Sequence, residues 1–153
     1  MAKNYVRLDK VGGQDHYESF VSAEKIVNGQ WLDLGDMDLD LGIEVANVTK
    51  TVEGKEPDAL ACTVFINYGE LNYEETEQAL EIGKAGRALI KKKGQIVSFN
   101  AENAPGVVPG DDVTVGANGL GVKKAEAEDV VIGKVIREDY LNFIGDLVVV
   151  RLK

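Results

Sequence analysis

The apolar residues of this chain fall in short runs rich in valine and isoleucine, and glycine-containing turns separate the runs. Runs of this length, with β-branched residues inside and turn residues at their ends, are typical of β-strands. The strand candidates are residues 60–68, 95–100, 113–115, 130–136 and 147–152. Residues 147–152 are apolar at both alternating sets of positions except for Arg151. We therefore expect this last strand to be central and buried on both faces.

Tight turns that contain glycine predict three hairpins. Asn-Gly is the strongest two-residue hairpin signal, because both residues tolerate the left-handed backbone of a type I′ turn. The predicted hairpins are residues 113–115 followed by Asn118-Gly119, residues 21–27 with 30–34 through Asn28-Gly29, and residues 87–91 with 95–99 through Lys93-Gly94.

Residues 73–93 carry a helical pattern. Glutamates come early and lysines late, which is the order that complements a helix dipole, and apolar residues recur at helical spacing. Gly83 and Gly86 oppose a long helix, because each costs about 1 kcal/mol relative to alanine. We therefore expect one short helix near residues 74–82.

Length and composition favour a single globular domain. The chain has 153 residues, of which 44% are hydrophobic and 28% charged, with 17 glycines and 3 prolines. We predict a mainly β fold, a compact β-barrel or β-sandwich with one short helix. Residues 11–153 form this β-rich domain, most clearly over 94–153. Residues 1–10 form either an extended N-terminal arm or an edge strand of the same domain.

Composition also excludes several classes of protein. No apolar run approaches the ~20 residues of a membrane span. Residues 1–10 contain basic residues with no apolar stretch after them, so we expect no signal peptide. Cys62 is the single cysteine and His16 the single histidine, which excludes an internal disulfide framework and most zinc sites. These features fit a reducing cytoplasm.

The net charge of −9 is unevenly distributed along the chain. Residues 11–82 carry sixteen acidic and three basic side chains, whereas residues 83–124 carry seven basic and three acidic ones. Residues 1–10 have a net charge of +2 and residues 125–153 of −2. Because a phosphate backbone requires a basic face, we expect no nucleic-acid partner. The charged blocks are either solvated faces or surfaces that meet within one subunit or between copies.

No residue pattern predicts a catalytic or cofactor site. Cys62 lies inside an apolar strand candidate, where a free cysteine usually behaves as a small hydrophobe, so we expect no catalytic pair with His16. Residues 83–87 (GKAGR) and 116–121 (GANGLG) match neither a P-loop nor a dinucleotide fingerprint, and we interpret them as turns. Lys123-Lys124 lacks the flanking residues of a biotin or lipoyl carrier.

Residues 36–42 (DMDLDLG) have some features of an ion site. Asp36, Asp38 and Asp40 have the spacing of the first three ligands of a calcium-binding loop. The glycine falls one place late, however, and the twelfth position is Asn47 instead of glutamate. With a period of two, the carboxylates share one strand face, where they repel each other unless a positive group offsets them. We favour an edge strand, with an ion site as the alternative.

The C-terminal half combines four motifs in a recurring order: a Gly-Asp-x-Val strand, a glycine-rich hairpin, an x-Ile-Gly-x-Val strand and a hydrophobic terminal strand. They are residues 110–115, 116–121, 131–135 and 147–152. This order resembles that of small β-rich structural proteins of tailed bacteriophages. Residues 29–35 (GQWLDLG) resemble the same group less clearly.

The resemblance implies a capsid decoration or cement protein, which binds the outer surface of a phage head and stabilises it. It implies the major capsid protein as partner, a homo-oligomer such as a trimer, and no direct contact with nucleic acid or membrane. The chain would be made in the host bacterial cytoplasm and carried on the capsid surface of the virion. A phage tail or head-completion protein, and a cytoplasmic ligand-binding β-barrel or small enzyme, are the alternatives.

A shell protein needs many weak contacts multiplied by copy number instead of one deep pocket. The basic N-terminal segment and the acidic run at 36–40 are the candidates for such contacts. We therefore predict interface roles for six residues, and no catalytic, cofactor-binding or metal-binding residue. The predicted interface residues are Lys3, Tyr5, Arg7, Asp36, Asp38 and Asp40.

Overall fold

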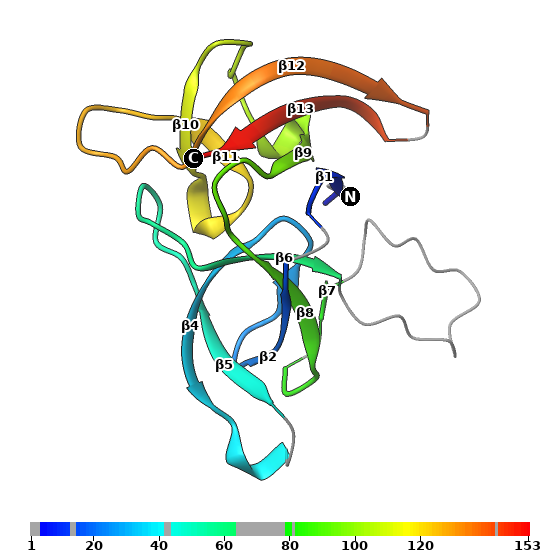
Figure 1. The fold of residues 1–153 in the computed structure, drawn as a ribbon, viewed down its shortest axis with the longest axis vertical. Coiled ribbons are helices and arrows are strands. Elements are labelled where there is room, and N and C mark those ends of the chain that lie inside the picture. Colours follow the sequence, from blue (N-terminus) through cyan, green and yellow to red (C-terminus); the bar gives the residue numbers. More distant parts are fainter. Residues whose placement is uncertain (1–3, 13–14, 42–43, 64–78, 81, 143) are drawn as a thin grey trace.

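The computed structural model describes residues 4–12, 15–41, 44–63, 79–80, 82–142 and 144–153. Its architecture is mainly β, with a six-stranded sheet beside a closed five-stranded barrel (Figure 1). The predicted fold class is therefore confirmed. No helix in these residues is both long enough and apolar enough to cross a membrane.

The sheet contains strands from both ends of the chain. In spatial order it consists of β1 (Val6–Lys10), β9 (Ile96–Asn100), β13 (Gly145–Leu152), β12 (Gly133–Leu141), β10 (Asp112–Val115) and β11 (Val122–Lys124). All its strand pairs are antiparallel. The last strand of the chain, β13, lies between β9 and β12, and its residues 147–150 are buried, so its predicted central position is confirmed.

The barrel is built from the first half of the chain and one later strand. Around the barrel the order is β2 (Tyr17–Ser22), β5 (Val45–Lys50), β4 (Trp31–Met37), β6 (Ala59–Thr63) and β8 (Gly86–Ile90). β2 and β5 are parallel, and the other neighbouring strands around the barrel are antiparallel. A separate pair joins β3 (Ile26–Val27) to β7 (Ala79–Leu80). Short 3₁₀ turns are η1 (Leu39–Leu41), η3 (Ala101–Asn103) and η4 (Ala117–Gly119).

Side chains fill the interior of the barrel. They are Phe20, Ile26, Leu32, Val48, Ala59, Ala61, Leu80 and Ala88. None of them is more than 5% exposed. A barrel of few strands has a narrow interior, which explains why three of these residues are alanine. The interior is therefore a packed core.

One row of large side chains joins the barrel to the sheet. Trp31, Leu60 and Leu89 lie opposite one another on β4, β6 and β8, and all three are buried among apolar residues of the sheet. Because successive side chains of a strand point to opposite faces, their neighbours in sequence line the barrel interior instead. The indole Nε1 of Trp31 donates a hydrogen bond to the carbonyl of Gly121, 2.9 Å away. Barrel and sheet thus share one continuous core.

Of the predicted hairpins, the one at Asn118-Gly119 is confirmed. β10 and β11 pair across it, and Asn118 and Gly119 have positive φ angles of 57° and 74°. The predicted strand at 130–136 begins later and runs longer, as β12. β6 covers the start of the strand predicted at 60–68, and residues 64–68 lie outside the described residues.

The other two hairpins are wrong, although their turns lie where the sequence places them. Gly94 has a φ of 92°, but β8 pairs with β2 and β6, whereas β9 pairs with β1 and β13. The turn therefore carries the chain from the barrel to the sheet. Gly29 also has a φ of 92°, but β3 pairs with β7 instead of β4. In both cases the strand before the turn pairs with strands distant in sequence instead of with the strand that follows it.

The predicted short helix near residues 74–82 is only partly testable. Residues 74–78 and 81 lie outside the described residues. Ala79 and Leu80 form β7, and Leu80 fills the barrel interior, so the helix does not extend to these positions.

The strand predicted through residues 36–42 ends early. β4 ends at Met37, and η1 follows at Leu39–Leu41. The Asp38 carboxylate accepts a hydrogen bond from the Asp40 backbone N–H at 3.0 Å, which favours a turn over a continued strand. The period-two interpretation is therefore wrong beyond Met37. β4 pairs with β6 only at Trp31 and Leu32, so its end at Asp36 and Met37 is paired with β5 alone, as the predicted edge position requires.

The N-terminal segment is part of the sheet. Of the two alternatives for residues 1–10, the structure has the edge strand, because β1 pairs with β9 over Val6 to Lys10. The side chains of Val6 and Leu8 pack against the shared core. Residues 1–3 lie outside the described residues.

Candidate interaction surface

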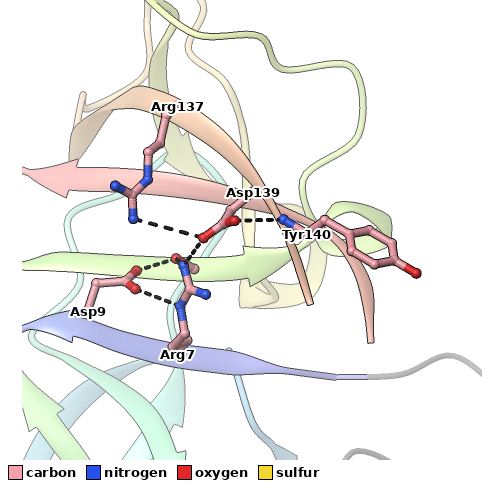
Figure 2. Close-up of polar contacts among 6 residues, drawn as sticks. Arg7, Asp9, Arg137, Asp139 and Tyr140 are labelled. Carbon is pink, nitrogen blue, oxygen red and sulfur yellow. Dashed lines mark hydrogen bonds and ion pairs between the residues drawn. The ribbon is translucent and has the colours of Figure 1, made fainter. Parts of the chain in front are cut away.

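Arg7 is the centre of a charged network on the outer face of the sheet (Figure 2). Its Nε lies 2.6 Å from Oδ1 of Asp9, and its Nη2 lies 2.7 Å from Oδ2 of Asp139. Nη2 also donates to the hydroxyl of Ser98 at 3.4 Å, and that hydroxyl donates to the second oxygen of Asp9. The network joins β1, β9 and β12.

Strand alternation explains why these side chains meet. Val6 and Leu8 point to the core, so Arg7 and Asp9 point to the outer face of β1. Arg7 lies opposite Ser98 on β9. On β12, an irregularity in register between Val135 and Arg137 accompanies a bend that carries the strand over this face, as Figure 2 shows.

The network favours the charged forms of Arg7 and Asp139. The hydrogen bond to Asp139 raises the pKa of Arg7 above its usual value, although burial opposes the shift, and the charge of Asp9 adds to it. The hydrogen bond from Arg7 lowers the pKa of Asp139, and a second bond, from the Tyr140 backbone N–H at 2.8 Å, acts in the same direction. This part of the face is therefore neutralised within the chain.

A cleft of about 260 Å³ lies beside the network, and we call it the cationic cleft. Its lining residues are Asp9, Lys10, Ile96, Ile136, Arg137 and Arg151. Both carboxylate oxygens of Asp9 already bind Arg7 and Ser98. Within the described ranges no ion pair involves Lys10 or Arg151, and Arg137 reaches a carboxylate only at 3.9 Å, at Asp139. The cleft thus carries three cations with little compensation. A wider cleft next to it shares Asp9 and Lys10 and extends to the turn at Lys93-Gly94.

The far end of the barrel carries the opposite charge. Residues 36–40, which we call the barrel tip, end β4 and begin η1, and Figure 1 places them away from the sheet. Leu39 is 89% exposed and Met37 46% exposed. Asp36, Asp38 and Asp40 alternate with these apolar side chains, and no ion pair to them occurs among the described residues.

The structure separates the predicted interface residues into two groups. Tyr5 and Arg7 lie together at the sheet edge, where the Tyr5 backbone exchanges hydrogen bonds with Asn100 at 3.1 and 3.3 Å. The three aspartates lie on the barrel tip. Lys3 lies outside the described residues. Their roles in an interface remain predictions.

Sequence reasoning missed Lys10, Arg137, Asp139 and Arg151 as members of this surface. Strand alternation alone places Arg151 on the face opposite Val150. The sequence carries no signal for the bend in β12 that brings Arg137 to the cationic cleft.

His16 lies on the surface of the barrel, whereas Cys62 packs against the core. Nε2 of His16 lies 3.1 Å from the Glu18 carboxylate, on an exposed side chain. Cys62 is partly buried and packs against the shared core. The described residues contain no cluster of three His, Cys, Asp or Glu side chains that could hold a metal ion.

Residues 116–121 form a turn, as predicted, but residues 83–87 do so only in part, because Gly86 and Arg87 begin β8. Gly83 and Gly119 have positive φ angles of 78° and 74°. Lys123 forms ion pairs with Glu53 at 2.8 Å and Asp129 at 3.5 Å. Lys124 pairs with Asp111 at 3.2 Å. Both lysines therefore hold neighbouring loops.

Comparison with known proteins gives a likeness of fold. No protein-family model matches the sequence. No curated protein matches it either. Among solved structures, the chain is similar to the head fiber gp8.5 N base of bacteriophage phi29, with a TM-score of 0.60 and 14% sequence identity. The match covers 92% of this chain and 95% of that one.

The fold of this chain resembles that of a phage structural protein. The resemblance inferred from the C-terminal half is thus confirmed, and it extends over the barrel as well. The similar protein is described as a head fiber base and not as a cement or decoration protein.

Proposed function

We propose that this chain is a structural protein of a tailed-phage head, carried in the virion on the outer surface of the capsid. The observation that supports the proposal is the likeness of fold to a phage head fiber base over nearly the full length of both chains. A match of this extent includes both the barrel and the sheet, and so the arrangement that joins them.

The alternative of a ligand-binding barrel has less support. Among the described residues, Phe20, Leu32 and other apolar side chains fill the barrel interior, whereas a small-ligand site is a cleft or an open cavity. The alternative of an enzyme would need a nucleophile beside a base or a set of shifted acids. His16 contacts Glu18 on the surface and Cys62 packs on the core, so neither contributes to such a site. We infer that the chain acts by binding.

We further propose the major capsid protein as the partner and a homo-oligomer as the bound state. A cement protein strengthens the shell, whereas a fibre base attaches an appendage. The fold likeness favours attachment, and the sequence resemblance favours reinforcement. Both functions require a surface that docks on capsomers with many equivalent copies, each contributing modest affinity.

The test uses particles of the phage that encodes this chain. Gold-labelled antibody against the chain should mark the heads in electron micrographs. Label on tails would favour the tail alternative, and absence of the chain from purified particles would overturn the proposal. Heads made without the chain should then bind the purified protein saturably in a pelleting assay, with an unrelated acidic protein as control. The fraction of heads that survive heating should then be measured with and without bound protein. A higher fraction with the protein indicates reinforcement of the shell, and an unchanged fraction indicates attachment alone.

A further inference from the structure

The cationic cleft has the chemistry of a site for an acidic segment that carries one apolar side chain. Lys10, Arg137 and Arg151 surround it, and Ile96 and Ile136 provide its apolar wall. At about 260 Å³ it is smaller than the ~300–1,000 Å³ typical of small-molecule sites, so it suits one or two side chains better than a cofactor. Its charge favours carboxylates over any neutral occupant.

The barrel tip has the complementary chemistry. Leu39 is 89% exposed and Met37 is 46% exposed, so the tip presents two apolar side chains, and Asp38 and Asp40 flank Leu39. The bond from the Asp40 backbone N–H to Asp38 fixes the turn, so the tip is presented in a defined shape. A preformed segment loses less conformational entropy on binding.

We propose that the barrel tip of a second copy of this chain occupies the cationic cleft. Leu39 of one copy packs on Ile96 and Ile136 of the next, and its flanking aspartates pair with the cations of the cleft. The tip and the cleft lie on different parts of the molecule, the tip at the end of the barrel away from the sheet (Figure 1). One chain therefore does not fill its own cleft, and the contact is head-to-tail.

A contact of this kind joins two different surfaces, so each copy retains one free tip or one free cleft. Such heterologous contacts close into rings or continue as open chains. The contact is small and charged, so it is weak in free solution and weakens further with salt. It does not depend on attachment to a capsid, and it can be tested on the purified protein.

Two variants remove one side of the contact each. The tip variant is Asp38→Asn, Leu39→Ala and Asp40→Asn, in which the amide at position 38 still accepts the turn hydrogen bond. The cleft variant is Lys10→Gln and Arg151→Gln, both exposed side chains. Matched controls remove the same charges elsewhere: Glu102→Gln with Asp146→Asn, and Lys55→Gln with Lys84→Gln, all at exposed positions.

Sedimentation velocity over a concentration series measures the outcome. The wild type and both controls should associate at about 50 mM salt and dissociate at about 500 mM salt. Each variant alone should remain monomeric. An equimolar mixture of the two variants should form dimers and nothing larger, because it contains one intact cleft and one intact tip for each pair.

Three results would overturn the proposal: a monomeric wild type at all concentrations, association that both variants retain, or a mixture that gives no dimer. If the wild type is monomeric and the cleft variant fails to bind phage heads, the cleft receives a capsid segment instead of a second copy. That result would leave the proposed function standing, so the two failures are distinguishable.

Discussion

Nη2 of Arg7 lies 2.7 Å from Oδ2 of Asp139, and this ion pair joins β1 to β12 although β9 and β13 lie between these strands in the sheet. A flat sheet would hold the two residues three strand spacings apart. Figure 2 shows β12 bending over the outer face, which brings the carboxylate within reach. The edge strand β1 is therefore held both by its pairing with β9 and by the ion pair with β12.

This pair predicts a specific dependence of stability on pH. The pKa of Asp139 is lowered in the folded protein, mainly by its bond from Arg7. Its contribution to the free energy of unfolding is thus fully present above the ordinary carboxyl value of 3.8 and is lost as pH falls through the lower folded value. Asp139→Asn should lower the stability at about pH 7, and its deficit relative to the wild type should be smaller at about pH 2. Urea unfolding measures both.

The matched control is Asp146→Asn. Asp146 is exposed on β13 and forms no ion pair with any described residue. Its substitution should leave the difference in unfolding free energy between about pH 7 and about pH 2 as it is in the wild type. If Asp139→Asn and Asp146→Asn behave alike, the ion pair contributes nothing to folding stability.

The turn that contains Gly121 predicts a steric effect at the junction of barrel and sheet. Gly121 has a φ of 61°, and a Cβ there would overlap the carbonyl of Asn103. Gly106 has a similar φ of 71° with open space around it. Gly106→Ala should cost about 1 kcal/mol from the left-handed backbone alone. Gly121→Ala should cost about 2–4 kcal/mol, since overpacking adds to that strain. Thermal unfolding of the two variants isolates the steric part.

The sequence predicts where strands and turns lie better than it predicts which strands pair with each other. Turns at Gly29, Gly94 and Gly119 are correct, because glycine tolerates a backbone that other residues avoid. Pairing across Lys93-Gly94 is wrong, because β8 and β9 each find partners far along the chain. Local chemistry fixes where the chain turns. Burial of both faces of each strand decides where it goes next, and that depends on the whole fold.

The same limit applies to the interaction surface. Arg7 stands out in the sequence as a cation in a short basic segment, but its partner Asp139 is 132 positions away. The aspartates of residues 36–40 are evident from spacing, yet β4 ends at Met37, and a hydrogen bond from the Asp40 backbone N–H to the Asp38 carboxylate favours a turn there. Neither contact follows from a periodic pattern.

Removal of β1 should destabilise the protein. Val6 and Leu8 are partly buried against the core, and each should contribute about 1 kcal/mol, less than the ~1.5–3 kcal/mol of a fully buried side chain. Deletion of residues 1–10 also leaves β9 with an unpaired edge. Urea unfolding should show a lower midpoint, and Val6→Ala with Leu8→Ala should reproduce much of the loss. An unchanged midpoint after deletion would indicate a detachable arm instead.

Calcium should not stabilise the protein through the barrel tip. Asp38 uses one oxygen for the turn bond to Asp40, and Asp36 lies on β4 before the turn, so the three carboxylates do not enclose a common point within one loop. True binding at a hundredfold excess over the dissociation constant would add about 2.7 kcal/mol. Melting curves with millimolar calcium and with EDTA should coincide. A shift that Asp38→Asn removes would show that an ion site exists.

Trp31 is the single tryptophan of the chain, and it reports directly on the junction of barrel and sheet. Its ring is fully buried, 5.9 Å from that of Phe99 on β9, and its indole N–H binds Gly121 beyond β10. Because the two parts share this core, neither can unfold without exposing the apolar row of the other. Tryptophan fluorescence and far-UV circular dichroism should therefore report one coincident transition in urea.

Trp31→Phe gives this prediction its control. The variant loses the hydrogen bond to Gly121 and part of the contact with Phe99, which should cost about 1–3 kcal/mol. If the junction couples the two parts, the circular dichroism transition of this variant stays single and moves to lower urea. Should it instead divide into two steps, one for the barrel and one for the sheet, the core between them would be too weak to make the fold cooperative, and each part would carry its own stability.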